Sequence, residues 1–421
     1  MTAQAPTLSD LTRVFGRIGL LSFGGPAAQI ALMHRELVEI RGWLDEEGFL
    51  RALSFCMLLP GPEAMQLATF AGWRLRGVPG GLIAGTLFVA PGAAVILALV
   101  AGYTAWGAVP MVQALFLGIK ATVVVIVLQA LARLGQKALK TPTRWALAGL
   151  AFLAIFAFAL PFPLLIAAAA LWGYATATGA PLPRTACDDR PRTGRTIAIW
   201  GALWLGPVAA LHALGGGLLA EIATFFSKLA TLTFGGAYAV LAWMAQEVVA
   251  TRGWLTPEQM IDALGLAETT PGPLILVTQF VGFLAGQEAG GWALGLAAAA
   301  VTLWVTFVPC FLWIFAGAPY VDRLAGFPRL SAALDAVTAA VVGVILNLSL
   351  WFAAHVAFAR VGRVTAGPFD MIAPDWSSFQ PHAIVLGALA ALMLLGFRWP
   401  LPLVLVLMAG AGAHARGGIF L

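Results

Sequence analysis

Charged residues are scarce in this sequence. They make up 10% of its 421 residues, while apolar residues make up 61%. An ordinary soluble domain carries about 25% charged residues. Because a chain of this composition cannot cover a water-facing surface, the sequence excludes a soluble globular domain and predicts a polytopic membrane protein.

The signatures of several enzyme and binding classes are missing as well. Cys56, Cys187 and Cys310 are too few and too scattered for a disulfide framework or a metal site, and the five histidines are dispersed. No phosphate-binding loop is present. The Lys and Arg residues that give the net charge of +5 stand in short runs between apolar segments rather than in one patch. We therefore expect no enzyme, no cofactor, no metal and no nucleic-acid partner.

Apolar stretches long enough to span a membrane follow one another almost without pause. We expect an all-α membrane protein with about eleven to thirteen transmembrane helices. The candidate spans are 12–33, 50–73, 79–103, 110–132, 145–159, 161–178, 196–214, 222–245, 260–285, 291–317, 331–356, 382–397 and 399–415. Basic loops favour the cytoplasm, which places 133–144 and 184–195 there, whereas Arg41, Arg360 and Arg363 fall on predicted outer loops.

The strongest organisational signal is an internal repeat. At one constant offset, three motifs of the first half recur in the second half. They are 23–25 (Phe-Gly-Gly) with 234–236, 41–44 (Arg-Gly-Trp-Leu) with 252–255, and 60–62 (Pro-Gly-Pro) with 271–273. We divide the chain into a first repeat at 1–180, a cytoplasmic linker with an extra transmembrane helix at 181–221, and a second repeat at 222–421.

The number of spans indicates how the two copies are oriented. Six spans in each copy and one linker helix make the copies enter the membrane in opposite directions. Inverted repeats are typical of secondary transporters, whose sites form near the midplane from broken helices. Proline removes a backbone donor and glycine loosens the backbone, so we predict broken helices at the double-Gly and Pro-Gly-Pro motifs.

The predicted breaks favour an anion site, because the N–H groups at the start of a half-helix need partners and attract negative charge. The alternative is that these glycines and prolines only kink or pack helices. The candidate substrate-binding residues at the breaks are Gly24, Gly25, Pro60, Gly61, Pro62, Gln66, Gly235, Gly236, Thr270, Pro271, Gly272 and Pro273.

Three cations within predicted spans suit an anionic substrate. Arg17 and Lys228 occupy equivalent repeat positions one or two turns before each double Gly, and Lys120 lies well inside a span. The alternative for Arg17 and Lys228 is that their side chains extend to a membrane face. We expect all three to belong to an anion-attracting shell.

One carboxylate directly follows a Pro-Gly-Pro break. Glu63 either caps the half-helix, whose dipole stabilises it, or couples transport to protons by neutralising Lys120 or Arg17 until substrate arrives. Glu268, before the second Pro-Gly-Pro motif, is the next coupling candidate.

Together these motifs resemble a known family. The segments 22–26, 41–44, 59–63 and 66–68 are similar to the first half of a ChrA-type chromate ion transporter, and 233–236, 252–255 and 268–274 are similar to its second half. The resemblance adds Ser22 to the substrate-binding candidates. It implies a two-domain inner-membrane protein that exports chromate, gives chromate resistance and couples to protons. Met65 departs from the family pattern, which often has Gln there.

Other functions remain open at this point. The residues do not distinguish chromate from sulfate or another divalent oxyanion, and the same site would serve an anion channel. A membrane-embedded transferase is a third class. The partners that we consider are the oxyanion, protons, membrane lipid and a second copy of the chain as a homodimer.

Overall fold

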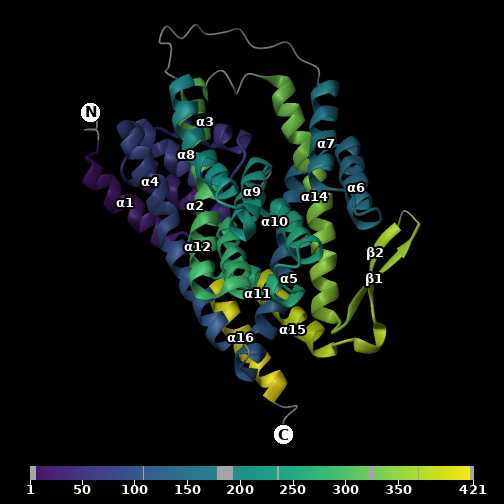
Figure 1. The fold of residues 1–421 in the computed structure, drawn as a ribbon. Helices are drawn as coiled ribbons and strands as arrows, with labels where there is room; N and C mark the ends of the chain where they lie inside the picture. The colour runs from purple at the N-terminus through teal and green to yellow at the C-terminus, as the bar shows by residue number, and fades with distance from the viewer. Residues whose placement is uncertain are drawn as a thin grey trace. The chain divides into compact units, whose positions relative to one another are not determined.

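The computed structural model describes residues 6–107, 109–177, 193–234, 237–321, 327–367 and 369–417. Within these ranges the chain is helical except for one two-stranded hairpin and the connecting turns (Figure 1). Cys187, Gly235 and Gly236 lie outside the described residues. The all-α membrane class is confirmed, and the hairpin is an addition that we did not expect.

The chain forms two compact units. One unit contains Met1–Val100, Thr178–Ala237 and Thr270–Ser331, and the other contains Ala101–Ala177, Tyr238–Thr269 and Ala332–Leu421. Each unit therefore takes segments from both sequence copies. The division at 1–180, 181–221 and 222–421 describes the repeat, not the compact units, and stays a prediction.

The first unit is built from helices that are interrupted at the predicted motifs. Its elements are α1 (Leu8–Leu21), α2 (Gly25–His34), a π-helical turn (Arg35–Ile40), α3 (Glu46–Leu58), most of α4 (Glu63–Trp106), α8 (Thr193–Ala213), α9 (Gly217–Thr231), a 3-10 turn (Leu274–Leu276), α12 (Val277–Gly317) and a 3-10 turn (Ala318–Tyr320). Helix α12 packs against α9 and α8 (Figure 1). Apolar side chains such as Phe15, Phe88 and Phe283 are fully buried between these helices.

Helices α4 and α12 each fold back on themselves. Arg76 with Gly77, and Gly290 with Gly291, have non-helical backbone angles inside them. A Cβ atom on Gly72 would lie 2.2 Å from the carbonyl oxygen of Gly80. Residues eight apart in a straight helix are about 12 Å apart, so the chain must reverse here. The arm before each reversal is shorter than the ~20 residues that a membrane crossing takes.

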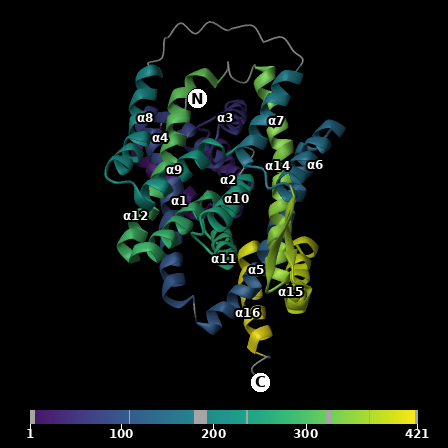
Figure 2. The same ribbon diagram turned by 45° about the vertical axis from the view of Figure 1, so that its right-hand side comes forward.

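The second unit surrounds α5 (Pro110–Ala138), which packs against three other helices, α16 (Leu401–Gly417), α15 (Pro381–Ala391) and α11 (Pro257–Glu268) (Figure 2). Its other elements are α6 (Pro142–Phe156), α7 (Phe162–Thr176), π-helical turns at Glu247–Thr251 and Leu392–Gly396 and a 3-10 turn (Trp376–Ser378). Two further helices, α10 (Ala237–Gln246) and α14 (Pro328–Ala357), begin in the first unit, just before the boundary, and continue in the second. Strands β1 (Val361–Ala366) and β2 (Phe369–Pro374) pair antiparallel, with Val361 opposite Pro374.

Five helices in the described part of the chain are long and apolar enough to cross a membrane, judged by length and composition. They are Glu63–Trp106, Pro110–Ala138, Thr193–Ala213, Leu274–Tyr320 and Pro328–Ala357. Shorter apolar helices accompany them. Four predicted spans, 12–33, 50–73, 222–245 and 260–285, contain a double-Gly or Pro-Gly-Pro motif, and each is divided there into two helices. The total of eleven to thirteen spans stays a prediction.

The Arg-Gly-Trp-Leu motif has the same local structure in both copies. Arg41 pairs with Glu36 at 3.5 Å in the first unit, and Arg252 pairs with Glu247 at 3.2 Å in the second. Each guanidinium also lies over the tryptophan two residues further on, at 5.2 and 4.9 Å from the ring centre. This cation–π contact and ion pair hold the chain after each π-helical turn.

Candidate functional site

Two pairs of broken segments cross within the first unit. The N–H of Gly61 donates to the carbonyl of Thr233 at 2.8 Å, and the N–H of Gly272 donates to the carbonyl of Ser22 at 2.8 Å. Gly61 and Gly272 are equivalent repeat positions, and so are Ser22 and Thr233. The same hydrogen bond therefore occurs twice, each time from the glycine of a Pro-Gly-Pro motif in one copy to a carbonyl of the other copy. Each Pro-Gly-Pro break is held by the segment that precedes the double Gly of the other copy.

Glycine is required at these breaks by the backbone angles. Gly61 has a φ of +123° and Gly272 of +90°, while Gly24 and Gly25 have +87° and +79°. Residues with a side chain rarely adopt this region. The helices end before these positions and begin again after them, at Gly25, Glu63 and Leu274. The predicted breaks are therefore present at every motif that the structure describes.

Four helix starts surround a small cavity in the first unit. Its lining comes from the starts of α2, α4, α10 and the Leu274–Tyr320 helix, and consists of Pro26, Gln29, Gly61, Pro62, Glu63, Ala64, Ala237, Pro273, Leu274 and Ile275. Equivalent repeat positions face the cavity in pairs, for example Pro62 with Pro273 and Ala64 with Ile275. Because the N-terminal end of a helix carries partial positive charge, the cavity lies where several such ends converge.

The polar side chains of this cavity come from the first copy. Gln29 is 1% exposed, and its Nε2 donates to the carbonyls of Gly272 at 2.7 Å and Ser22 at 3.2 Å. Among the described residues, its Oε1 has no hydrogen-bond partner. Glu63 lines the cavity at the start of α4, and its repeat equivalent is the apolar Leu274. The cavity is therefore asymmetric, with a polar and an apolar side.

Gln66 positions a break and does not line the cavity. Its side chain is fully buried, and Nε2 donates to the carbonyl of Pro60 at 2.7 Å. A Cβ atom on Gly61 would lie 2.7 Å from this Nε2 and 3.0 Å from Sγ of Cys310. The first Pro-Gly-Pro break is thus closely packed against Gln66 and Cys310, and the binding role of Gln66 stays a prediction.

The predicted cations do not line this cavity. Arg17 lies 3.7 Å from Glu36 with 62% of its side chain exposed, and Lys228 is exposed on α9. None of the described residues that line the cavity is Lys or Arg. An anion-attracting shell that contains Arg17 and Lys228 therefore stays a prediction without support from this conformation.

Lys120 is paired in the second unit. Its Nζ lies 3.2 Å from Oδ1 of Asp262, and the hydroxyl of Tyr103 donates to Oδ2 of the same carboxylate at 2.9 Å. Asp262 is only 5% exposed. In this conformation Asp262 lies beside Lys120 and Glu36 lies beside Arg17, and the neutralisation of either cation by Glu63 stays a prediction. The buried carboxylate of Asp262 needs such a partner, since an unpaired charge in an apolar surrounding is costly.

The second coupling candidate also has a partner. Glu268, at the end of α11, accepts a hydrogen bond from the hydroxyl of Tyr238 at 2.7 Å. Thr270 is buried, and Pro271 lies close to α4, because a Cβ atom on Gly92 would be 2.2 Å from its carbonyl oxygen. The second Pro-Gly-Pro break is therefore packed closely against α4 at Gly92.

Sequence reasoning missed several lining residues. Gln29 is the most important of them, because its amide bridges the carbonyls of Ser22 and Gly272, one from each copy. A signal was present, since Gln29 is the one strongly polar residue in the apolar run from Pro26 to Met33. Pro26 and Ala237 lie one residue beyond the double glycines and carry no polar group to draw attention.

Comparison with known proteins identifies a family that the sequence matches. A family model described as "Chromate transporter" matches residues 9–174 and 220–413. No solved structure matches the chain significantly.

Three curated relatives match most of the chain. A chromate transport protein of Cupriavidus metallidurans is 30% identical over 82% of this chain and 82% of its own length. A probable chromate transport protein of Synechococcus elongatus is 31% identical over 81% of this chain and 83% of its own. A chromate transport protein of Pseudomonas aeruginosa is 34% identical over 87% of this chain and 86% of its own.

Proposed function

The chain belongs to the chromate transporter family, and from this premise we propose that it carries chromate across the inner membrane through the cavity at the crossed breaks. Relatives named as chromate transport proteins cover more than four fifths of the chain. The proposal includes efflux as the direction and chromate resistance as the consequence.

The observation that carries the proposal is the convergence of helix starts around one cavity. Backbone N–H groups at a helix start bind tetrahedral oxyanions without a side-chain cation. The amide Nε2 of Gln29 stands beside them, although in this conformation it donates to Gly272 and Ser22. An oxyanion that took over these hydrogen bonds would also loosen the contact between the two breaks.

The size of the cavity implies a conformational step. Its volume is about 20 Å³, which is room for roughly one water molecule. Chromate is larger, so the helix starts must separate for it to bind. In an alternating-access cycle this conformation is a closed one, and the paired hydrogen bonds of Gly61 and Gly272 are the contacts that opening would break.

Glu63 gives the proposed coupling its sign. An ionised carboxylate in the cavity wall repels a dianion, and a protonated one does not. Oxyanion and proton therefore favour each other's binding at Glu63, and by reciprocity each raises the affinity of the other. Such a pair travels together. Exchange in opposite directions would instead require the two to compete, for example if Glu63 released its proton before the substrate bound.

A specific observation also favours sulfate as an alternative substrate. The lining offers backbone N–H groups and one amide, which recognise the charge and tetrahedral shape that chromate and sulfate share. An anion channel with the same site is the second candidate function. A membrane-embedded transferase lacks a recognisable catalytic cluster in the described part of the chain, and a homodimer stays a prediction.

Counterflow in proteoliposomes tests the proposal. Vesicles that contain the purified protein and unlabelled chromate should transiently accumulate labelled chromate from outside. A transporter shows this overshoot, whereas a channel only equilibrates the label. Parallel vesicles loaded with sulfate measure the preference between the two oxyanions. If neither anion gives counterflow and both leak at the same rate as from protein-free vesicles, the proposed function is wrong.

A further inference from the structure

The second unit contains a larger cavity that the proposed transport path does not use. Its volume is about 290 Å³, and it lies between α6, α10, α14 and the β-hairpin. Most of its wall is apolar, formed by Ile155, Phe156, Ala242, Ala245, Val249, Ala250, Pro257, Leu348, Trp351, Val361 and Ile372. A cavity of this size with apolar walls is suited to a small amphiphilic ligand.

Polar side chains face the same space. Gln246 and Asn347 line the cavity, and the structure gives neither side-chain amide a hydrogen-bond partner among the described residues. His355 lines it too, with Nδ1 bonded to the carbonyl of Trp351 at 2.9 Å, so that Nδ1 is the protonated nitrogen. Amide groups without partners in a partly buried wall are costly unless a ligand or water satisfies them.

The β-hairpin contributes one positive and one negative charge. Nε of Arg363 lies 3.0 Å from Oδ1 of Asp370, and both residues line the cavity. Oδ1 of Asp370 is buried, yet the pair is not aligned as a hydrogen bond. With His355 neutral, the net charge of the residues that line the cavity is therefore zero. The two charged groups, Arg363 and Asp370, lie side by side.

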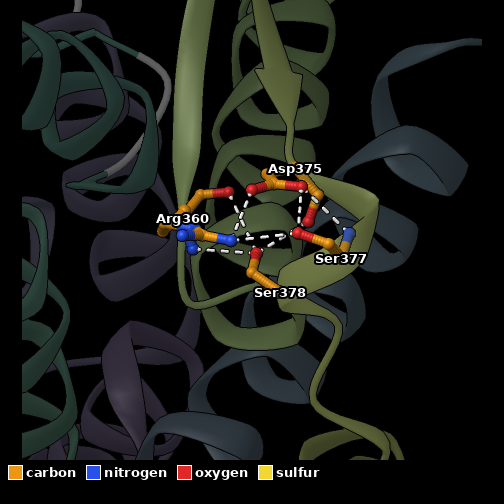
Figure 3. Close-up of polar contacts among 4 residues, drawn as sticks. All are labelled: Arg360, Asp375, Ser377 and Ser378. Atoms are coloured by element: carbon orange, nitrogen blue, oxygen red, sulfur yellow. Dashed lines mark hydrogen bonds and ion pairs between the residues drawn. The ribbon is translucent and has the colours of Figure 1, made fainter.

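The hairpin is fixed at its base and along β2. Arg360 pairs with Asp375 at 2.8 Å and donates to the Ser377 hydroxyl at 2.9 Å, and the Ser378 hydroxyl closes the cluster (Figure 3). Hydrogen bonds from Ser377, with the Arg360 guanidinium nearby, hold the pKa of Asp375 below its usual value. Further along, the N–H of Asp370 donates to the carbonyl of Ala157 at 2.9 Å. The cavity wall on this side is a fixed element.

Exposed aromatic residues flank the β-hairpin. Trp376 is 79% exposed, Phe379 47% and Phe369 42%. Aromatic side chains of this kind concentrate where lipid headgroups begin. A hairpin at this level would set the ion pair of Arg363 and Asp370 beside the lipid headgroups.

We propose that this cavity binds the headgroup of an aminophospholipid. The phosphate group lies against the guanidinium of Arg363, the ammonium group against the carboxylate of Asp370, and the amides of Gln246 and Asn347 bind phosphate or ester oxygens. The acyl chains follow the apolar wall past Phe156 and Leu348. A zwitterion matches a neutral pair of charges, whereas a free dianion would face Asp370 with only one cation to balance it.

Native mass spectrometry of the full-length protein in mixed phospholipid tests the proposal. The probe lipids are phosphatidylethanolamine, phosphatidylglycerol and phosphatidylcholine in equal amounts. Wild-type protein should retain phosphatidylethanolamine in preference to both others. Arg363→Gln should lower its retention about tenfold, the scale of one charge-assisted hydrogen bond. Lys137→Gln, the same change of charge at an exposed position on α5, should have no effect.

Asp370→Asn makes the test specific. Removing the negative charge should shift the preference from phosphatidylethanolamine to phosphatidylglycerol, which a structural defect would not do. Asn347→Leu, which leaves the ion pair intact, should weaken retention of every lipid at this site. Equal retention of the three lipids by wild type, or an unchanged preference in Asp370→Asn, overturns the proposal. Release of the lipid by millimolar sulfate alone also overturns it and assigns the cavity to a free oxyanion. A failure of chromate counterflow would leave this conclusion about lipid binding unchanged, because lipid retention is measured separately from transport.

Discussion

Among single residues, Glu63 carries the proposed coupling. Glu63→Gln keeps the shape of the side chain and removes its titration, so chromate counterflow should continue while its dependence on pH disappears. The measurement is the initial rate of counterflow across a series of pH values. Glu288→Gln, which changes an exposed carboxylate on α12, should keep the wild-type profile. If Glu63→Gln also keeps that profile, Glu63 is a helix cap, and Glu268 becomes the coupling candidate.

Lys120 has two competing roles that one pair of variants separates. Lys120→Ala leaves Asp262 buried without its cation, which should lower the free energy of unfolding by about 3–5 kcal/mol. Lys120→Ala combined with Asp262→Ala removes both charges and should recover most of this loss. Thermal unfolding and counterflow are measured on both proteins. If the double variant regains stability and transports normally, Lys120 is structural. If it regains stability without transport, Lys120 belongs to the anion path.

The sequence predicted some site residues and not others for a physical reason. Gly61, Pro62, Glu63 and Pro273 stood out because a motif that breaks a helix in a membrane leaves backbone groups that need partners. Arg17 stood out as a charge in an apolar span, but its partner Glu36 comes from a segment whose packing the sequence does not reveal. Contacts that depend on how helices cross cannot be read from spacing along one helix.

At the level of elements, the crossed breaks are the feature on which transport depends. Gly61→Ala forces a side chain into a φ of +123° and places Cβ within 3.0 Å of Gln66 and Cys310. The backbone strain alone costs of order 1–3 kcal/mol. We expect this variant to lose counterflow.

Gly77→Ala is the matched control for this element. It also has a positive φ, +61°, but a Cβ atom there meets nothing within 4 Å. Gly77→Ala should therefore cost stability by strain and still transport chromate. Equal loss of counterflow in both variants, at equal amounts of folded protein by size-exclusion chromatography, would show that the effect is strain and not the break.

The elements also show where sequence patterns fall short. Apolar length alone does not reveal the breaks within 12–33 and 260–285, because a short break hardly lowers the mean hydropathy of a long window, and only the Gly and Pro motifs indicated them. The β-hairpin escaped notice for another reason. Its strands have only six residues each, and they stand between apolar helices where an ordinary loop was expected.

For the whole molecule, the open question is the orientation of the two copies. We predict that they are inverted, so that cysteines placed at Arg41 and Arg252 are labelled from opposite sides of the membrane. The experiment uses a background in which the three native cysteines are replaced and a membrane-impermeant thiol reagent. A cysteine at Lys137 serves as the marker for the cytoplasmic side. Labelling of both test positions from one side means that the copies run parallel.

The central claim is that chromate passes through the cavity at the crossed breaks, and filling that cavity tests it most directly. Ala237 lines it at the start of α10, whereas Ala300 is an exposed alanine on α12. Labelled chromate counterflow is measured in proteoliposomes that contain equal amounts of wild type, Ala237→Phe or Ala300→Phe. The account predicts that Ala237→Phe abolishes counterflow, since a phenyl ring exceeds the volume of about 20 Å³, while Ala300→Phe transports like wild type. Wild-type counterflow in a folded Ala237→Phe protein would contradict it.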